Sequence, residues 1–399
     1  MKSKIIFIFL FLQFAFGSKA QTLTKSIAFP INQTQSINNT PVNFANATPG
    51  GVSAGISKAI GDNSDIRIFP SPVWQSEVHI AINRANPNIL LTSANTYNPT
   101  TGNHNQGYYY STDGGNTWQG ADALQNSPAQ VGGDPSTAIS ATGRMYISTI
   151  RIGGGYLIQN SANNGTNFSA LVASAVNVTG FDKEMIAADD QPNSPYVNNV
   201  YCAWTNFGAG NGNIEFNRSV DNGSTFSTPI TLKSTATGQG TNVQTGPNGE
   251  VYVCWADYNV DAYGNQLMPA AGLGFVSSVN GGVSFTNSQR VFTYNGIRTS
   301  NTGIPVFGNI RVNDFPSMAV EKSNSTVRGR IYVCYPEFDA NQRSIIRVRS
   351  SDNRGVTWTN PVTVSIANAT QSFFPWRMYL YALIVDGAVI DTKRMILTK

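Results

Sequence analysis

The chain has 399 residues, of which 12% are charged, and a formal net charge of +4. This length accommodates roughly two or three ordinary domains or one large repeat-built domain. Lys2, Lys4 and Lys19 supply three of the positive charges and no dense Lys or Arg stripe is present, so the composition argues against nucleic acid as a partner. The low charge and the many Asn, Ser, Thr and Gly residues are typical of a turn-rich β protein.

The first twenty residues have the pattern of a secretory signal peptide. Lys2 and Lys4 precede an apolar run over residues 5–16, and a short segment resembling a cleavage site ends at Ala20. The run is too short for a comfortable membrane span, and no cysteine follows Ala20 to accept a lipid anchor. We therefore expect residues 1–20 to be removed, no membrane span, and a secreted or cell-surface protein.

An eight-residue pattern then recurs five times: Ser, any residue, Asp or Asn, any residue, Gly, any residue, Thr, Ser or Asn, and an aromatic residue. The copies are STDGGNTW from Ser111, SANNGTNF from Ser161, SVDNGSTF from Ser219, SVNGGVSF from Ser278 and SDNRGVTW from Ser351. Their starts are 50, 58, 59 and 73 residues apart, which is the spacing of four-stranded propeller blades. Short β-rich runs bounded by turn residues precede each copy, so each unit predicts four antiparallel strands, A to D, with the pattern in the turn between strands C and D.

The chemistry of the pattern predicts a structural role. An Asp or Asn side chain at the third position can bond to nearby backbone N–H groups, glycine at the fifth supplies a positive φ, and the aromatic ring can pack between neighbouring sheets. The structural residues expected from this are Ser111, Asp113, Gly115, Trp118, Asn163, Gly165, Phe168, Asp221, Gly223, Phe226, Asn280, Gly282, Phe285, Asn353, Gly355 and Trp358.

These five copies resemble the Asp box, or BNR repeat, of sialidases and related secreted β-propellers, over roughly residues 75–361. The resemblance implies an all-β, sialidase-like β-propeller of four-stranded blades, with six intended, five complete and the last apparently truncated. We expect a lead-in over residues 21–64, the propeller over 65–376 and an atypical tail over 377–399. Because the tail lacks a sixth box, we expect the chain to be truncated there or to end in a shifted reading frame.

Cysteine and histidine usage favours neither a metal nor a cofactor. Cys202, Cys254 and Cys334 lie in similar apolar contexts, YCAW, YVCW and YVCY, which favours buried small side chains over disulfide partners or metal ligands. Only His79 and His104 are present, which excludes a zinc site of the HExxH type. We expect no metal and no cofactor, and nothing in the sequence indicates an oligomeric state.

A candidate site is expected at the axis, at the end opposite the boxes, because strands alternate in direction and the starts of strands A meet there. Polar residues expected at this end include Glu77, Asp134, Asp182, Lys183, Glu184 and Asp314. The converging carboxylates could perform acid and base catalysis, could be solvated loop groups, or could form a cation site. We predict catalytic roles for Asp134, Glu184 and Asp314, and substrate binding by Asp182.

The resemblance also implies three arginines that hold a substrate carboxylate, together with a tyrosine nucleophile. Blade geometry places Arg67, Arg298 and Arg311 as the arginines and Tyr258, or alternatively Tyr335, as the nucleophile. Arg67 lies in RIFP, close to the family's Arg-Ile-Pro but with an inserted phenylalanine. The segment SANTYNPTTGNHNQG of the first unit has no Arg or Asp where the family places a second polar cluster.

Two functions remain open from the sequence. The first is a secreted sialidase-like glycoside hydrolase of the exo-α-sialidase type, acting on an extracellular glycan or glycoprotein. The second is a non-catalytic propeller that binds glycan or protein at the cell surface, which the missing Arg and Asp of the first unit favour. Tyr108, Tyr109 and Tyr110 could stack on a sugar in either case, or could belong to a packed strand.

Overall fold

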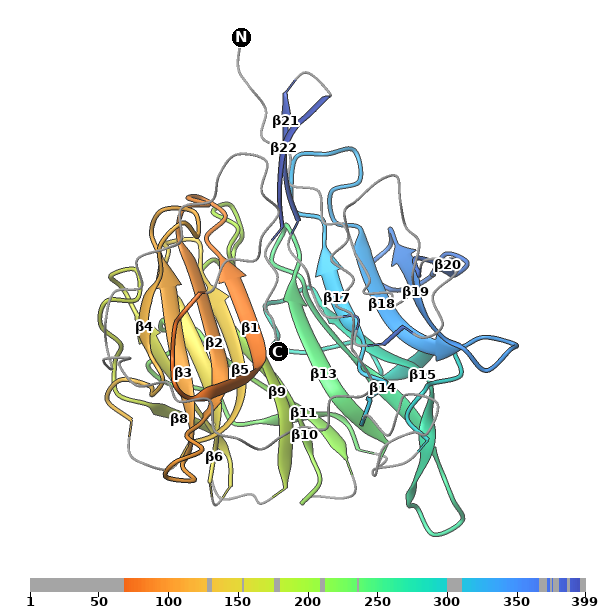
Figure 1. The fold of residues 1–399 in the computed structure, drawn as a ribbon. Coiled ribbons are helices and arrows are strands. Elements are labelled where there is room, and N and C mark those ends of the chain that lie inside the picture. Colours follow the sequence, from red (N-terminus) through yellow and green to blue (C-terminus); the bar gives the residue numbers. More distant parts are fainter. Residues whose placement is uncertain are drawn as a thin grey trace.

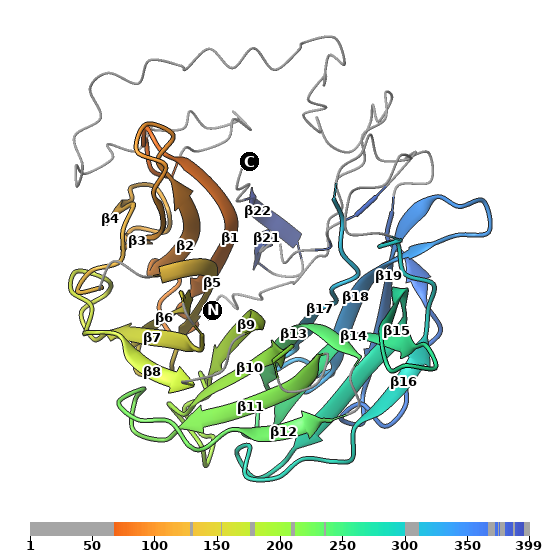
Figure 2. The ribbon, with the colours of Figure 1, turned by 90° about the horizontal axis from the view of Figure 1, so that it is seen from below.

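The computed structural model of the chain describes residues 68–394 except 128–130, 153, 176–179, 209–211, 235–236, 300–310, 366–371, 374, 376–379 and 386–387. Five four-stranded antiparallel sheets, blades 1 to 5, follow one another in chain order around a common centre (Figures 1 and 2). Within the described ranges there is no α-helix, and so none of the length and apolar character needed to cross a membrane.

Each blade is a simple meander in which consecutive strands pair. Blade 1 contains β1 (Trp74–Ile82), β2 (Leu90–Tyr97), β3 (His104–Ser111) and β4 (Gln119–Ala121). Blade 2 contains β5 (Val131–Ile139), β6 (Met145–Arg151), β7 (Tyr156–Ser161) and β8 (Val172–Ala175). Blade 3 contains β9 (Phe181–Ala188), β10 (Val200–Asn206), β11 (Asn213–Ser219) and β12 (Ile230–Lys233). Blade 4 contains β13 (Gly238–Thr245), β14 (Val251–Val260), β15 (Gln266–Ser278) and β16 (Gln289–Thr293), and blade 5 contains β17 (Ser317–Val320), β18 (Ile331–Phe338), β19 (Ser344–Ser351) and β20 (Val362–Thr363).

The predicted all-β fold of four-stranded blades is confirmed. After the fifth blade, β21 (Leu380–Val385) and β22 (Ala388–Arg394) form a separate two-stranded sheet, for which the backbone alone is described. The predicted lead-in over residues 21–64 lies outside the described residues. All three cysteines are buried and form no disulfide with one another. Cys202 and Cys254 lie in apolar clusters between blades, whereas Cys334 Sγ contacts the backbone carbonyls of Ser317 and Pro375.

The five boxes share one hydrogen-bonding pattern in the turn between the third and fourth strands of each blade. In blade 1 the Ser111 hydroxyl accepts the Gly115 N–H (2.9 Å), and the Asp113 carboxylate accepts the N–H and hydroxyl of Thr117 (2.9 and 2.6 Å). In the other four boxes the N–H of the fifth-position glycine also donates to the first-position serine, and the N–H of the seventh residue donates to the Asp or Asn at the third position. The fifth-position glycines have φ between +75° and +90°, where other residues are strained.

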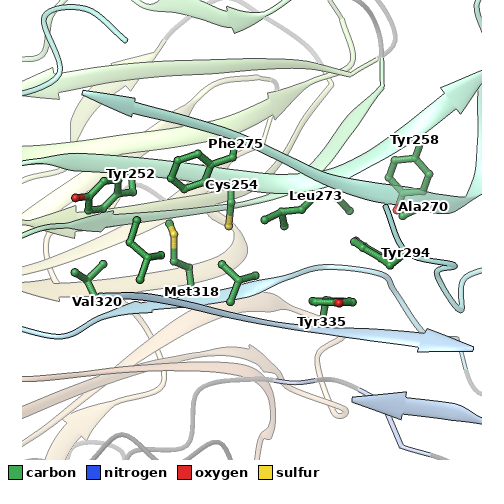
Figure 3. Close-up of a cluster of buried hydrophobic side chains, with 13 residues drawn as sticks. Tyr252, Cys254, Tyr258, Ala270, Leu273, Phe275, Tyr294, Met318, Val320 and Tyr335 are labelled. Carbon is green, nitrogen blue, oxygen red and sulfur yellow. The ribbon is translucent and has the colours of Figure 1, made fainter. Parts of the chain in front are cut away.

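In blades 2 to 5 the aromatic residue of the box fills the space between its own blade and the preceding one. Phe168 packs edge-on against Tyr108 of blade 1 (ring centroids 5.2 Å apart), and Phe285 packs against Phe216 of blade 3 (4.8 Å). Trp358 packs against Phe275 in the cluster between blades 4 and 5, part of which Figure 3 shows. Trp118 of blade 1 lies in a cluster with Phe69, which precedes β1. Since the rings lock successive sheets together, the boxes contribute to packing between blades as well as to local turns.

We expect Gly355→Ala to lower the free energy of unfolding by about 3 kcal/mol, since it combines left-handed strain with overpacking. Gly355 has φ +85°, and an added Cβ would collide with the ring of Phe275. Gly264→Ala is the matched control, because Gly264 has φ +82° with no atom within 4 Å of the added carbon, and should cost about 1 kcal/mol. Urea unfolding of both variants measures the difference, and equal losses would contradict packing between blades 4 and 5 at the fifth box.

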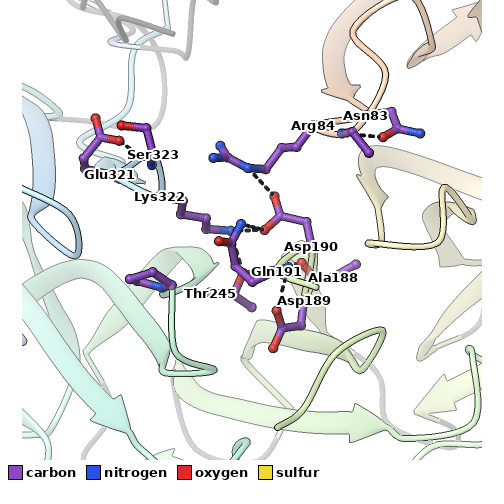
Figure 4. A network of polar contacts seen from close by, with 12 residues as sticks. Asn83, Arg84, Ala188, Asp189, Asp190, Gln191, Thr245, Glu321, Lys322 and Ser323 are labelled. Atoms are coloured by element: carbon purple, nitrogen blue, oxygen red, sulfur yellow. Dashed lines mark hydrogen bonds and ion pairs between the residues drawn. The ribbon is translucent and has the colours of Figure 1, made fainter. Parts of the chain in front are cut away.

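A second set of contacts joins four blades at the end of the axis where the innermost strands finish (Figure 4). Asp190, just after β9, accepts from Lys322 (2.9 Å), just after β17, and lies 3.7 Å from Arg84, just after β1. Lys322 also donates to Thr245 of β13 (2.6 Å). Although burial alone would raise the pKa of Asp190, the charges of Lys322 and Arg84 lower it. This network holds blades 1, 3, 4 and 5 together at one end and leaves the other end of the axis for the candidate site.

Candidate functional site

The innermost strands of blades 1 to 4 share a β-bulge at the same place. In each of β1, β5, β9 and β13 two residues oppose one residue of the neighbouring strand, and the first of the two has a positive φ. These first residues are Glu77 (φ +51°), Asp134 (φ +56°), Lys183 (φ +48°) and Gly240 (φ +68°). Only the fourth is glycine, so three charged side chains are held in a conformation that L-residues rarely adopt. Bulges of this kind change the direction in which a side chain points.

The three charged bulge residues meet at the axis. Lys183 Nζ lies 2.5 Å from Glu77 Oε2 and 2.8 Å from Asp134 Oδ1, so one ammonium joins carboxylates from two other blades. Neighbouring blades fix the bulges themselves. Asn95 of β2 accepts the backbone N–H of Asp134 (2.9 Å), and the Thr241 hydroxyl of β13 donates to the carbonyl of Lys183 (2.9 Å).

The pKa values of the two carboxyl groups shift in opposite directions, although burial acts to raise both. Burial raises the pKa of Glu77 above its ordinary value of 4.5, and the neighbouring Asp134 raises it further. Burial also acts to raise the pKa of Asp134, but hydrogen bonds and the Lys183 charge outweigh it, so this pKa falls below 3.8. For Lys183, burial alone would lower the pKa, whereas the charges of Asp134 and Glu77 raise it. The cluster therefore pairs a readily protonated carboxyl group with an ionised one, the combination used for proton transfer.

A polar chain extends this cluster towards blade 4. Asp182, beside Lys183, accepts a hydrogen bond from Gln239 Nε2 (2.7 Å), and Gln239 Oε1 accepts one from Arg298 Nη1 (2.5 Å). Burial raises the pKa of Asp182 above its ordinary 3.8. Of the arginines that the structure describes, Arg298 is the one that contacts this chain of side chains, so it is placed to hold an anionic group of a ligand.

Glu184 lies directly behind the cluster, between blades 2 and 3. Its side chain is 2% exposed, its Oε1 accepts only a long contact from the Ser148 hydroxyl (3.5 Å), and its Oε2 has no partner among the described residues. Burial, and next the Asp134 charge, raise its pKa well above 4.5. Burial therefore favours the neutral form of Glu184, and its side chain contacts Ser148 rather than the ion-paired cluster.

Tyr258 and Asp314 lie apart from the ion-paired cluster, in the packing between blades 4 and 5. Asp314 is buried and accepts three backbone N–H groups, from Ala270 (2.9 Å), Ile297 (2.5 Å) and Arg298 (2.9 Å). Burial raises its pKa. Tyr258 is 1% exposed, its pKa is raised by burial and by Asp314, and its ring belongs to the apolar cluster of Figure 3. This geometry favours an anchoring role for Asp314 and a packing role for Tyr258.

The remaining predicted residues do not join the cluster in the described structure. Arg311 is exposed just before β17, and Arg67 lies outside the described residues. Tyr335, the alternative nucleophile, is buried, and its hydroxyl accepts a hydrogen bond from Arg349 Nε (3.1 Å). Tyr108, Tyr109 and Tyr110 are also buried, so they belong to a packed strand and are not a sugar-stacking surface.

Sequence reasoning placed Glu77 and Lys183 at this end of the axis without giving either a role, and it missed Gln239. When the innermost strands are aligned on their bulges, Gln239 of blade 4 occupies the position that Asp182 occupies in blade 3, which would have identified it. Within the described parts of the chain, no three His, Cys, Asp or Glu side chains are arranged to hold a metal ion.

Comparisons with known proteins were made by sequence and by fold. No protein-family model and no curated protein matches the sequence. Among solved structures, the chain is similar to the intramolecular trans-sialidase from Ruminococcus gnavus at 11% identity and a TM-score of 0.51, over 83% of this chain and 90% of that one. A leech intramolecular trans-sialidase gives 8% identity and a TM-score of 0.52, over 80% of this chain and 65% of that one.

A Hadza microbial sialidase is similar at 13% identity and a TM-score of 0.48, over 77% of this chain and 63% of its own length. This chain therefore spans less than two thirds of the leech and Hadza proteins. The likeness to the Ruminococcus and leech structures concerns the fold, and it shows that the chain has the sialidase-like β-propeller fold.

Proposed function

We propose that the protein is an exported, sialidase-like glycoside hydrolase whose active site is the cluster of Glu77, Asp134 and Lys183. One observation supports this most strongly: three charged residues from three blades are held at positive φ and meet at the axis. Non-glycine residues in such conformations cost roughly 1–3 kcal/mol each and concentrate at functional sites. Shifted pKa values in the same cluster support the same proposal.

In this proposal Glu77 donates a proton to the leaving glycosidic oxygen, and ionised Asp134 faces the positive charge that develops on the sugar ring. A water molecule then bonds to the anomeric carbon and returns a proton to Glu77. Lys183 keeps Asp134 ionised and holds both carboxyl groups in place. Asp182, Gln239 and Arg298 would orient sugar hydroxyl or carboxylate groups. We assign Asp314 and Tyr258 to support of the site and not to the chemical step.

The experiment is a panel of fluorogenic glycosides, including a sialoside, a xyloside, a galactoside and a glucuronide, tested with the wild type and Asp134→Asn. Turnover of at least one glycoside, reduced about 100-fold or more in the variant, would support the proposal, since positioned acid and base groups contribute about 10²- to 10⁴-fold. Asp352→Asn, at an exposed ion pair of the fifth box, should leave the rate unchanged. Equal rates for Asp134→Asn and the wild type would contradict the proposed active site.

If the enzyme is active, kcat/KM should have a bell-shaped pH dependence. Activity needs Asp134 ionised and Glu77 protonated, so it should fall as the pH drops through the lowered pKa of Asp134 and as the pH rises through the raised pKa of Glu77. The optimum therefore lies between the lowered pKa of Asp134 and the raised pKa of Glu77. Glu77→Gln should remove the fall on the alkaline side, and a fall that persists in this variant would assign the proton donor to another group.

A second candidate function is glycan binding without catalysis. It is favoured by the ion pairing of Lys183 with both carboxylates and by the single described arginine, Arg298, that contacts the polar chain. Absence of turnover across the panel, combined with oligosaccharide binding that Asp134→Asn weakens, would support this candidate. Absence of both turnover and binding would exclude both functions.

A further inference from the structure

A row of three aromatic rings crosses blade 1 at one end of its first three strands. Trp74 of β1 is paired in register with Tyr97 of β2, and Tyr97 is paired with His104 of β3. The ring centroids of Trp74 and Tyr97 are 5.3 Å apart, and those of Tyr97 and His104 are 4.7 Å apart. Trp74 is 63% exposed and His104 is also exposed, so the row, here called the blade 1 aromatic row, faces solvent.

This exposure is unusual for this chain. The tryptophans Trp118, Trp204 and Trp255 are no more than 1% exposed and pack between strands or blades. An exposed tryptophan ring leaves a large apolar area in contact with water. A ligand that stacks on the ring would bury this area. The row therefore has the form of a stacking surface, and the groups around it indicate which ligand it could bind.

The aromatic row adjoins the axial cluster. Side chains of β2 alternate between the two faces of the blade, so Tyr97 lies on the same face as Asn95 and Leu91. Leu91 packs with apolar residues of blade 2, and Asn95 accepts the backbone N–H of Asp134. At about 3.3 Å per residue, Tyr97 lies roughly 7 Å along the strand from the residue that touches Asp134.

The polar groups beside the row are amides and not charges. Asn95, Asn98, Asn103 and Asn105 lie in or between β2 and β3, where no Asp, Glu, Lys or Arg occurs between Leu90 and Ser111. Gln106 is fully buried and donates to the Ser148 carbonyl of blade 2, so it is not part of this surface. Aromatic faces with neighbouring amide groups match the C–H faces and hydroxyl groups of a pyranose ring. A lipid surface or an ionic partner would favour a larger apolar patch or charged residues.

We propose that the blade 1 aromatic row is a sugar-stacking subsite, which binds a pyranose ring of the same glycan chain whose end occupies the axial cluster. The inference rests on the proposed glycan-directed function and adds to it that the substrate or ligand is an oligosaccharide. Trp74 and Tyr97 provide the stacking surface, and the chain runs from the axis along the side of blade 1 that faces blade 2.

The first test uses 3′-sialyllactose, xylohexaose and a chitin hexamer as probes. Exposed tryptophans react with N-bromosuccinimide, and peptide mass spectrometry reports the oxidation of Trp74 separately from that of the buried tryptophans. At least one oligosaccharide should protect Trp74 from oxidation, whereas its constituent monosaccharide at the same concentration should not. Failure of all three oligosaccharides to protect Trp74 would overturn the proposal.

The second test uses substitutions. Trp74→Ala should weaken binding of the protecting oligosaccharide about 3- to 10-fold, as expected for the loss of one aromatic contact, and Trp74→Phe should restore part of it. Tyr263→Ala is the matched control, because Tyr263 is 90% exposed at the tip of the hairpin between β14 and β15, away from the row. An unchanged affinity in Trp74→Ala, or an equal loss in Tyr263→Ala, would overturn the subsite.

The two proposals can fail separately. If the protein hydrolyses glycosides, Trp74→Ala should raise KM for the oligosaccharide more than KM for a small aryl glycoside. If no glycoside is hydrolysed, oligosaccharide protection of Trp74 still tests the row. Loss of aryl glycoside turnover in Trp74→Ala would indicate a folding defect or a role in the chemical step, and it would contradict a role confined to the subsite.

Discussion

Replacement of Asp314 by alanine is expected to lower the free energy of unfolding by about 3 to 5 kcal/mol. The carboxylate accepts the backbone N–H groups of Ala270, Ile297 and Arg298, and each buried donor left without an acceptor costs about 1–3 kcal/mol, reduced where water can enter. Urea unfolding followed by intrinsic fluorescence measures the loss. Asp314→Asn should give an intermediate loss, since one amide oxygen remains as an acceptor while the NH₂ group faces a donor.

Asp352→Ala is the control for this variant. Asp352 is 63% exposed in its surface pair with Arg330, and its loss should cost no more than about 1 kcal/mol. The sequence predicted a catalytic role for Asp314, whereas its contacts favour the anchoring of the segment before β17. An Asp314→Ala protein as stable as the wild type but without turnover would restore the catalytic interpretation.

The second large effect is expected from Lys183→Met. This substitution keeps the length of the side chain but leaves Glu77 and Asp134 without their shared cation. Glu77 is about half-exposed, so the cost falls mainly on Asp134, and we expect a loss of about 2 to 3 kcal/mol near neutral pH, below the range for a fully buried pair. Acid should reduce the loss, because protonation of Asp134 removes the unpaired charge.

The direction of this pH dependence follows from the coupling between protonation and folding. A carboxyl group whose pKa is lowered in the folded state stabilises the fold above its unfolded pKa, and this contribution disappears as the pH falls through the folded pKa. The hydrogen bond with Glu77 and then Lys183 lower this pKa, and Lys183→Met removes the Lys183 contribution, so the stability difference between variant and wild type should shrink below about pH 4. Arg330→Met, at an exposed pair, provides the comparison, and a difference independent of pH would contradict the pairing with Asp134.

The fold was predictable because its information is local. Each box contains its own turn residues within eight positions, and the fifth-position glycine and the aromatic residue mark the hairpin without reference to distant parts of the chain. The spacing of the boxes then gives the blades. The aromatic rings between blades follow from the same pattern, because a single ring next to a tight turn has to pack against a neighbouring sheet.

The site was less predictable because it depends on strand register and on backbone conformation. The alternation of strands predicts that Asp134, Asp182 and Glu184 lie near one another, but no residue type at Glu77, Asp134 or Lys183 predicts a positive φ. The second residue of each bulge also points elsewhere, which separates Glu184 from Lys183 despite their adjacency in the chain. The packing role of Tyr258 and the anchoring role of Asp314 could not be predicted from the sequence, because both depend on contacts that form only when blades 4 and 5 pack together.

The aromatic row was missed for the same reason. Trp74, Tyr97 and His104 are widely spaced in the sequence and meet only through the register of three strands. The sequence instead suggested Tyr108, Tyr109 and Tyr110 as a sugar-stacking surface, but these side chains are buried in β3. Whether a side chain at the end of a strand is exposed depends on how far the neighbouring blade extends. The sequence of one strand does not predict this.

The central claim is that the bulges of the innermost strands place charged side chains at the axis to engage a glycan, at a cost in backbone strain. The most direct measurement is the oligosaccharide affinity of Asp134→Gly, because glycine, already present at the equivalent Gly240, relieves the strain while it removes the charge. We predict at least a tenfold loss of affinity with the free energy of unfolding within about 1 kcal/mol of the wild type, since relief of strain offsets the lost ion pair. Wild-type affinity in this variant would contradict the account.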